Sequence, residues 1–430
     1  MSSLSGTSVK EAVARGIRRR YRNERVFRAL GLAALLIGLG FLAFFFYTLV
    51  GNGYTALRQT RIHLDIVLDA AVIDPSATRD PAVLATADYQ RLARDALNAM
   101  FPAVTSRADL RALFGLLSPG AGIELQQLVT ADPSVIGSTR ALWLLADDDV
   151  DVLVKGHTPR DVPASERRLD DRELAWLTEL EQQGRVALQF NRYFFLNGDS
   201  RDPELAGIWG ATVGSFFTLL VTLALSFPLA VATAIYLEEF APRNRWTDVV
   251  EVNINNLAAV PSIVFGLLGL ALFINTFGLP RSAPVVGGLV LSLMTLPVII
   301  IASRAALTAV PPSIREAALG LGASKMQVVL HHVLPLAMPG MLTGTIIGMA
   351  RALGESAPLL MIGMVAFIVD VPTSPLSPAT ALPVQVYLWA DSPERAFVER
   401  TSAAIVVLLL FLLVMNAAAI LLRKRFERRY

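Results

Sequence analysis

The stretch Thr401–Leu422, TSAAIVVLLLFLLVMNAAAILL, contains no charged residue and is followed directly by Arg423-Lys424-Arg425. A helix needs about 20 apolar residues to cross the roughly 30 Å of hydrocarbon in a bilayer. Four other segments are equally free of charge: residues 29–57, 205–237, 252–280 and 282–303. Charged residues make up only 17% of the 430 residues, where soluble domains carry about 25%. The sequence therefore predicts an integral membrane protein.

Composition excludes several other classes. The chain has no cysteine and only four histidines, without metal-ligand spacing, so it predicts no disulfide, thiolate nucleophile or metal site. Its basic residues lie beside the apolar runs, which favours membrane orientation over nucleic-acid binding. The nearest match to a phosphate-binding loop, Gly320–Lys325, has the wrong spacing, so no cofactor is expected on this chain.

The charge pattern predicts how the chain crosses the membrane. Residues 1–28 carry eight Lys or Arg and form a basic cytoplasmic N-terminus, and residues 29–50 form a retained first span. Residues 51–205 hold 16 basic and 23 acidic residues and are predicted to form a small mixed α/β domain outside the membrane. Within it we expect helices in 88–117, broken at Pro102, and in 171–183, and a strand at Val150–Val154.

The remaining residues, 206–430, are predicted to hold five further transmembrane helices. These spans fall near residues 207–237, 252–278, 283–310, 337–368 and 401–422. With the first span, this predicts an all-α membrane protein of six transmembrane helices, with the α/β domain inserted between the first and second. Both termini and loop 311–336 then lie in the cytoplasm, which agrees with the basic C-terminal tail.

The cytoplasmic loop after the fourth span has its own local pattern. Pro311 and Pro312 end the preceding helix, and Ser313 with Glu316 is predicted to form a capping box. Apolar residues then follow at helical spacing, Gly322 allows a turn, and a second short helix is expected from Ser324 to Pro335. Such a helix can lie on lipid headgroups or against a protein partner.

This loop resembles the EAA loop of ABC importer permeases. The resemblance rests on Glu316-Ala317-Ala318, on Gly322 after three intervening residues, and on Leu334-Pro335, although His332 replaces an apolar residue of the motif. It implies that Glu316, Ala317, Ala318 and Gly322 couple the spans to separate ATPase subunits. ATP and Mg would then be bound by those partner chains, and this chain would be a transport subunit rather than an enzyme.

Three further stretches resemble the phosphate-importer permeases, and the PstA type more than the PstC type. They are Val260–Gly266, Ala350–Pro358 and Leu382–Tyr387, and residues 51–205 resemble the insertion of a longer PstA variant. The resemblance implies a cell inner membrane location, inorganic phosphate as substrate, and membrane lipid around the spans. It also implies three partners: a PstC-type permease, PstB-type ATPases and a periplasmic PstS-type binding protein.

Other functions stay open at this stage. The transported oxyanion could be sulfate, molybdate or phosphonate. The chain could instead be a membrane receptor whose 51–205 domain senses a ligand, or a membrane enzyme that uses this domain.

The fifth span carries the predicted substrate pathway. Gly340, Gly344 and Gly348 repeat every four residues and allow close helix packing. At about 100° per residue, Arg351 and Glu355 fall on the same face, so we expect both charges to point where the helix packs. They can form a structural ion pair, or Arg351 can offer its guanidinium to a passing oxyanion while Glu355 holds it in place.

Four other features receive structural interpretations. Arg304 is expected to extend toward lipid headgroups, and Pro261 to kink the third span. Residues His331 and His332 are read as solvated loop residues, and Asp147–Asp149 as a solvated turn.

Overall fold

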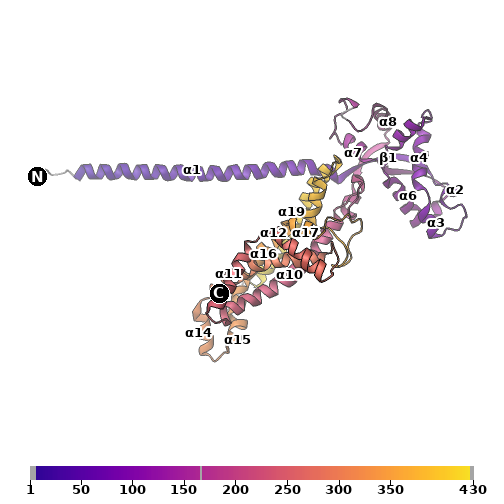
Figure 1. The fold of residues 1–430 in the computed structure, drawn as a ribbon. Coiled ribbons are helices and arrows are strands. Elements are labelled where there is room, and N and C mark those ends of the chain that lie inside the picture. Colours follow the sequence, from indigo (N-terminus) through magenta and orange to yellow (C-terminus); the bar gives the residue numbers. More distant parts are fainter. Residues whose placement is uncertain (1–5, 165–166, 427–430) are drawn as a thin grey trace. The chain divides into compact units, whose positions relative to one another are not determined.

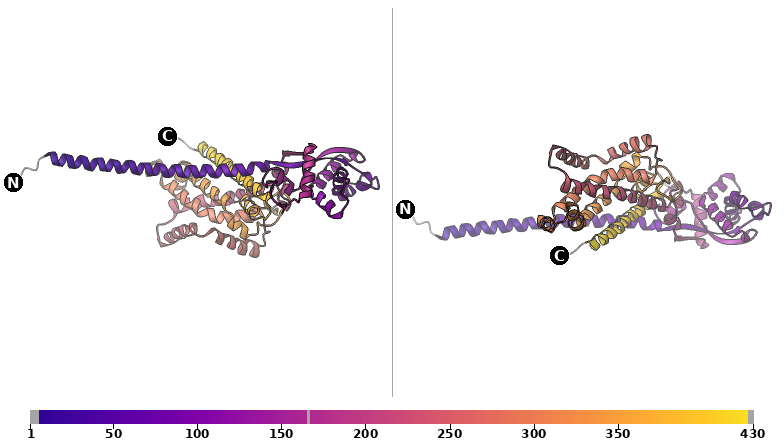
Figure 2. Two further views of the ribbon diagram at one scale, coloured as in Figure 1. Left: turned by 90° about the horizontal axis from the view of Figure 1, so that it is seen from above. Right: turned by 90° about the horizontal axis from the view of Figure 1, so that it is seen from below.

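The computed structural model describes residues 6–164 and 167–426. Residues 1–5 and 427–430 of the predicted cytoplasmic termini lie outside the described residues. The chain divides into two units, residues 1–52 and residues 53–430. Among the described residues, five helices are long and apolar enough to cross a membrane, or six if one bent pair counts as a single span. The chain is therefore a mostly helical, multi-pass membrane protein, as predicted (Figures 1 and 2).

The first unit consists of one helix, α1 (Gly6–Gly53), which contains the predicted first span. Its candidate membrane-crossing part begins at Arg20. The basic residues that precede the apolar run therefore continue the same helix.

The second unit begins with a small domain, here called the sheet domain (residues 53–205). Its antiparallel sheet has the order β2-β1-β3, with β1 at Arg58–Val67, β2 at Thr139–Leu145 and β3 at Val186–Phe190. Alternate residues of β1, such as Ile62 and Leu64, are fully buried, so one face of the sheet packs on the helices.

Short helices cover this sheet and connect its strands (Figure 1). The α-helices are α2 (Ala70–Ile73), α3 (Pro81–Thr86), α4 (Tyr89–Met100), α5 (Arg107–Phe114), α6 (Gly120–Ala131), α7 (Asp148–Val154), α8 (Asp171–Gln182) and α9 (Arg192–Leu196). The 3-10 turns are η1 (Tyr54–Leu57), η2 (Pro133–Val135) and η4 (Pro203–Leu205). The predicted helices in 88–117 and 171–183 are confirmed as α4, α5 and α8.

The strand predicted at Val150–Val154 is wrong, because these residues belong to α7. The Asp147 side chain accepts a hydrogen bond of 3.1 Å from the backbone N of Asp149 and caps the helix. All four residues from Val150 to Leu153 are buried. The alternation of valine with aspartate or leucine therefore does not mark one solvent face and one core face.

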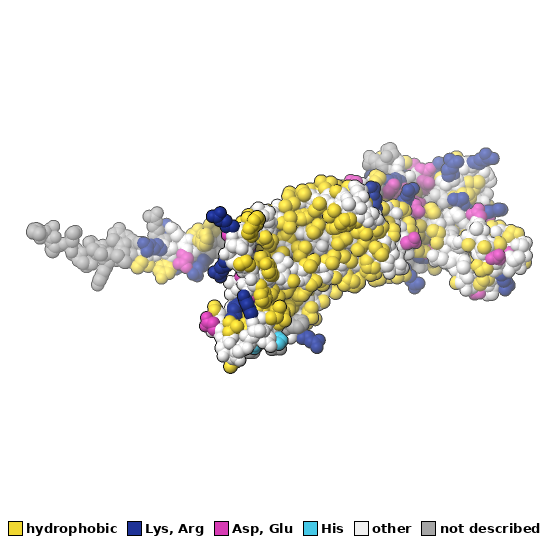
Figure 3. Space-filling model, turned by 60° about the horizontal axis from the view of Figure 1, so that its bottom comes forward, with side chains coloured by type: hydrophobic (Ala, Val, Ile, Leu, Met, Phe, Trp, Pro, Cys, Tyr) yellow, Lys and Arg dark blue, Asp and Glu magenta, His cyan; other side chains and the backbone are white. Residues whose placement is uncertain are grey.

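The helical core follows the sheet domain. Its long helices are α10 (Trp209–Ile235), α11 (Arg245–Ala258), α13 (Pro284–Thr308), α16 (Leu334–Gly354) and α19 (Ala396–Phe426). Its short helices are α12 (Ser262–Gly269), α14 (Pro312–Gly320), α15 (Lys325–Gln327), α17 (Ala357–Met361) and α18 (Leu382–Ala390). Three π-helical turns join them: η5 (Tyr236–Phe240), η6 (Leu270–Thr276) and η7 (Val328–Val333). Hydrophobic side chains dominate the face of the core seen in Figure 3.

Two predicted spans are interrupted. The third bends by 100° between Ala258 and Ser262, where Pro261 cannot continue the preceding helix. The fifth was predicted as residues 337–368, but α16 ends at Gly354, and Glu355 is outside the helix with φ −85° and ψ 114°. A continuous helix over 337–368 is therefore wrong.

Candidate functional site

The segment that joins α13 to α16, residues 312–333, is here called the loop segment. Helix α14 begins at Pro312 without a side-chain cap, so the predicted capping box of Ser313 with Glu316 is wrong. Proline suits the first helical position because it lacks the N–H that would otherwise go unpaired there. The capping box lies instead at α15, where Ser324 and Gln327 bond to each other's backbone N–H.

Pro335 does not stop the second helix of the loop segment, contrary to prediction. The helix runs from α15 through the π-turn η7 into α16, and Pro335 lies in the first turn of α16. A π-turn shifts the backbone bonding pattern, which lets the chain accommodate a residue without an N–H donor. The turn between α14 and α15 is at Gly322, whose φ of +87° favours glycine.

The predicted coupling residues lie on different sides of the loop segment. Glu316, Ala317 and Gly322 are exposed, whereas Ala318 is buried against apolar residues of the adjoining helices. Large apolar side chains beside them are exposed as well: Leu319, Leu321, Met326 and Leu330. The segment is thus a helix–turn–helix with one side packed on the core and an exposed side rich in apolar groups.

Arg315 anchors the loop segment to the end of α10. Its Nη2 lies 2.8 Å from Glu239 Oε1, and its guanidinium also donates to the carbonyl oxygens of Val310 (2.7 Å) and Leu307 (2.9 Å). Nearby, the Lys325 ammonium lies 5.2 Å from the centroid of the Phe240 ring. The sequence pattern did not identify these contacts, because the Arg315 and Glu239 positions are 76 residues apart.

Arg304 of α13, which the sequence analysis expects to extend toward lipid headgroups, forms ion pairs with two carboxylates. Its Nε lies 2.6 Å from Glu238 Oε1, and its Nη2 lies 2.8 Å from Glu251 Oε1. Two carboxylates from separate helical elements therefore neutralise one arginine.

The glycines of α16 lie against α13. A Cβ added to Gly340 would be 2.6 Å from the Ala306 Cβ, and one added to Gly344 would be 2.1 Å from the Ala302 Cβ. At Gly348 the added atom would meet the Ile299 side chain at an ordinary 3.4 Å. The close approach of the two helices therefore depends on the first two glycines.

Arg351 lies off this packed face, with 48% of its side chain exposed. Four residues turn a helix by about 40° beyond a full circle. Measured around the helix axis from Gly340, the line through the three glycines therefore moves gradually around the helix. At the level of Arg351 this line lies at about 110°, whereas Arg351 itself lies at about 20°. Met349 and Ala352, on the drifted side, are buried. The prediction that Arg351 points where α16 packs is therefore wrong within this chain.

Arg351 and Glu355 still face each other. The Arg351 Nε lies 3.5 Å from Glu355 Oε1, and the Glu355 side chain is 21% exposed. A long contact of this kind leaves the guanidinium fork open to a second acceptor.

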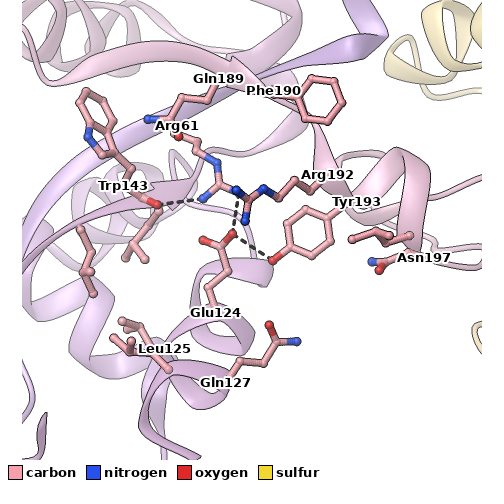
Figure 4. A pocket seen from close by; sticks show the side chains of 14 residues that line it. Arg61, Glu124, Leu125, Gln127, Trp143, Gln189, Phe190, Arg192, Tyr193 and Asn197 are labelled. Atoms are coloured by element: carbon pink, nitrogen blue, oxygen red, sulfur yellow. Dashed lines mark hydrogen bonds and ion pairs between the residues drawn. The ribbon is translucent and has the colours of Figure 1, made fainter. Parts of the chain in front are cut away.

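The sheet domain contains a cavity of about 830 Å³ (Figure 4). On its wall, Glu124 Oε1 accepts hydrogen bonds from Arg61 Nη2 (2.7 Å) and the Tyr193 hydroxyl (2.9 Å). Burial and the adjacent Glu124 charge raise the pKa of Tyr193 above its usual value. These hydrogen bonds link β1, α6 and α9, while the other carboxylate oxygen of Glu124, Oε2, is buried without a hydrogen-bond partner.

A buried ion cluster joins the sheet domain to α19; Asp151, Lys155, His157 and Glu399 are here called the junction cluster. The Lys155 Nζ lies 2.6 Å from both Asp151 and Glu399, and these three side chains are only 2–4% exposed. His157 Nε2 lies 3.1 Å from the second oxygen of Glu399. In the sequence, the only feature that could have drawn attention to Lys155 is that lysine is rare, with four in the whole chain.

Next to this cluster, Asp147–Asp149 are partly buried, and the predicted solvated turn is wrong. Their carboxylate oxygens lie within 4.8 Å of one another, close enough to hold a metal ion. Burial and neighbouring carboxylates raise the pKa of Asp147 to about 8 and that of Asp149 to about 6. Arg168 approaches Asp149 to 3.7 Å and already supplies positive charge.

A comparison with known protein families finds a match to most of the helical core. Residues 226–430 match the family described as "Binding-protein-dependent transport system inner membrane component". Residues 14–164 match a "Domain of unknown function (DUF3333)", which agrees with a long variant that carries an extra domain.

Individual proteins agree with the resemblance to PstA-type permeases, which is confirmed. The chain is 34% identical over 201 residues to the phosphate transport system permease protein PstA 1 of Mycobacterium tuberculosis (strain ATCC 25618 / H37Rv), covering 47% of this chain and 64% of that protein. It is 29% identical over 221 residues to PstA of Haemophilus influenzae, covering 51% and 76%. Over 173 residues it is 34% identical to the probable ABC transporter permease protein YqgI of Bacillus subtilis, covering 40% and 58%.

The chain thus spans about three fifths of the length of the Bacillus and Mycobacterium proteins that it matches. A solved structure of the MetNI methionine ABC transporter, in an inward-facing conformation, aligns with 51% of this chain and 98% of that chain. The sequence identity is 20% and the TM-score is 0.43.

Proposed function

We propose that this chain is the permease subunit of an ATP-driven importer that moves inorganic phosphate across the cell inner membrane by alternating access. The loop segment is the observation that carries the proposal. It exposes Leu319 (52%) and Leu321 (90%) on a helix–turn–helix that is anchored to the spans by Arg315. Exposed apolar groups on an anchored cytoplasmic segment favour a protein partner, here a separate ATPase. Phosphate as the substrate is supported by the names of the PstA relatives.

In this proposal the sheet domain lies outside the membrane, and both termini and the loop segment lie in the cytoplasm. The basic tail Arg423-Lys424-Arg425 supports that orientation. Two PstB-type ATPase subunits bind ATP and Mg and contact Glu316, Ala317 and the exposed apolar groups. A PstS-type binding protein delivers phosphate, and a PstC-type permease completes the membrane part.

Arg351 and Glu355 line the pathway between the two permease subunits. Arg351 is exposed on the surface of this chain, and a charge on a transmembrane helix usually faces a pathway or a partner rather than lipid. Its planar guanidinium can donate two parallel hydrogen bonds to an oxyanion. Glu355 competes for the same donors, so the anion is held weakly and released readily.

The test is uptake of labelled phosphate into vesicles that contain the whole complex with its binding protein. Arg351→Gln should abolish ATP-dependent uptake while ATP hydrolysis and phosphate capture by the binding protein persist. Arg281→Gln, in the exposed loop before α13, is the matched control and should transport normally. Unchanged uptake in Arg351→Gln would overturn the assigned pathway.

Competition distinguishes the substrates. Excess sulfate, molybdate or phosphonate should not reduce labelled phosphate uptake by the unmodified complex. Strong inhibition by one of these anions would assign that anion instead. A complex that binds a ligand but transports nothing would favour the membrane-receptor alternative.

A further inference from the structure

The end of α10 is held by three basic side chains in succession. Within the π-turn η5, Glu238 pairs with Arg304, Glu239 pairs with Arg315, and Phe240 lies 5.2 Å from the Lys325 ammonium. Arg304 belongs to α13, whereas Arg315 and Lys325 both belong to the loop segment. Two of the three contacts therefore join the loop segment to α10.

All three nitrogens of the Arg315 guanidinium donate hydrogen bonds. Its guanidinium donates through Nε and Nη2 to Glu239 and through Nη1 and Nη2 to the carbonyl oxygens of Val310 and Leu307. The side chains of Arg315 and Glu239 are 23% and 10% exposed, so water competes little for these donors. A planar fork bound on several sides resists rotation, which lysine could not reproduce.

Helix α10 is the element that such a contact would move. It begins at Trp209, directly after the sheet domain, and its 27 residues pack along α13. A displacement of α14 that is transmitted to Glu239 would therefore reach the whole length of α10. Without the Glu239 contact, the loop segment touches α10 mainly through apolar side chains, which can slide.

We propose that Arg315 and Glu239 are positioning residues that make the loop segment and the end of α10 move as one body during transport. The inference rests on the proposed function, since it concerns how ATPase movement enters the spans. The Lys325–Phe240 contact supports the same link from the second helix of the segment. The Arg304–Glu238 pair is its matched comparison, because it joins α10 to α13 and does not touch the loop segment.

The first test measures phosphate moved per ATP hydrolysed by the reconstituted complex. Coupling between two sites commonly amounts to about 5- to 150-fold. Glu239→Gln should lower the ratio about tenfold while ATP hydrolysis continues, because force no longer reaches α10. Glu238→Gln, one residue away, should stay within about twofold of the unmodified ratio.

Equal loss of the ratio in both variants, or no loss in either, would overturn the proposal. If Glu239→Gln does not assemble, Arg315→Lys serves in its place. It keeps the charge but cannot bind Glu239 and both carbonyl oxygens together, and the same drop in the ratio is expected.

A second test does not depend on the substrate. The chain contains no cysteine, so spin labels can be placed only where wanted, at Tyr236→Cys and Ser313→Cys, both exposed. In the complex, the distance between the labels should be the same with and without ATP, and should become ATP-dependent after Glu239→Gln. An ATP-dependent distance without that substitution would overturn the inference even if phosphate is imported. A constant distance without phosphate uptake would instead overturn the proposed substrate.

Discussion

The two ends of the helical core are held by ion pairs in different environments. Where the sheet domain meets α19, Lys155 lies between two carboxylates and the side chains are 2–4% exposed. At the C-terminal end of α10, far from the sheet domain in the sequence, the side chains of the Arg315–Glu239 pair are 23% and 10% exposed. Those of the Arg304–Glu238 pair are 24% and 25% exposed. The first is fully enclosed, and at the second the Arg304–Glu238 pair is the more open to water.

This difference in exposure predicts a difference in how much each ion pair contributes to stability. Removing one partner of a buried ion pair leaves an uncompensated charge away from water, which costs about 3–5 kcal/mol. Exposed pairs contribute about 0–1 kcal/mol, because water replaces the lost partner. Breaking the junction cluster should therefore cost much more than breaking the more exposed Arg304–Glu238 pair.

The largest expected effect comes from the buried joint. Lys155→Met leaves Asp151 and Glu399 facing each other without a cation, so the free energy of unfolding should fall by about 3–5 kcal/mol. The measurement is denaturant unfolding of the full chain in detergent micelles. Arg160→Met is the control, because Arg160 pairs with Glu181 on the surface of the sheet domain. Equal losses in the two variants would show that burial does not distinguish these pairs.

The acidic groups beside the junction cluster predict a pH dependence. Burial raises the pKa of Asp147 from 3.8 to about 8, that of Glu204 from 4.5 to about 7 and that of Asp149 from 3.8 to about 6, and neighbouring carboxylates add to this effect. The folded chain therefore holds protons that the unfolded chain has released. Stability from these groups falls as the pH rises from about 4 to about 8.

Thermal unfolding of the full chain between about pH 5 and pH 8.5 tests this slope. The unfolding temperature should decrease across the range, and Asp147→Asn should flatten the decrease. Asparagine still caps α7, so the variant changes the titration and keeps the helix start. The charged groups nearby, Arg168, Arg400, Asp148 and Glu394, stay in place in both proteins. An unchanged slope in Asp147→Asn would contradict the assignment.

The sequence predicted elements that depend on local pattern. Charge-free runs identified the apolar parts of α1, α10, α13 and α19, because the membrane demands about 20 apolar residues wherever a helix crosses it. Gly340 and Gly344 indicated a close helix contact because small residues at a four-residue spacing have few other uses in a span. Both signals lie within one element.

The predictions that failed concern features that depend on contacts between elements. Pro335 predicts a helix stop, but the π-turn before it accommodates the proline, and this turn depends on how the loop segment folds. Arg351 lies off the packed face of α16, because the line of contact with α13 moves around the helix along its length. The Lys155–Glu399 pair joins positions 244 residues apart, and only tertiary structure brings them together.

The smallest expected effect is at the Arg304–Glu238 pair, at the end of α10. In Glu238→Gln, Arg304 keeps Glu251 at 2.8 Å, and water can reach the vacated position, because the Glu238 side chain is 25% exposed. The free energy of unfolding should change by no more than about 1 kcal/mol, several times less than for Lys155→Met under the same conditions. A loss as large as that of Lys155→Met would contradict the distinction between the two ends. The same unfolding measurement on Glu239→Gln, whose side chain is only 10% exposed, decides whether a change in its transport reflects coupling or unfolding.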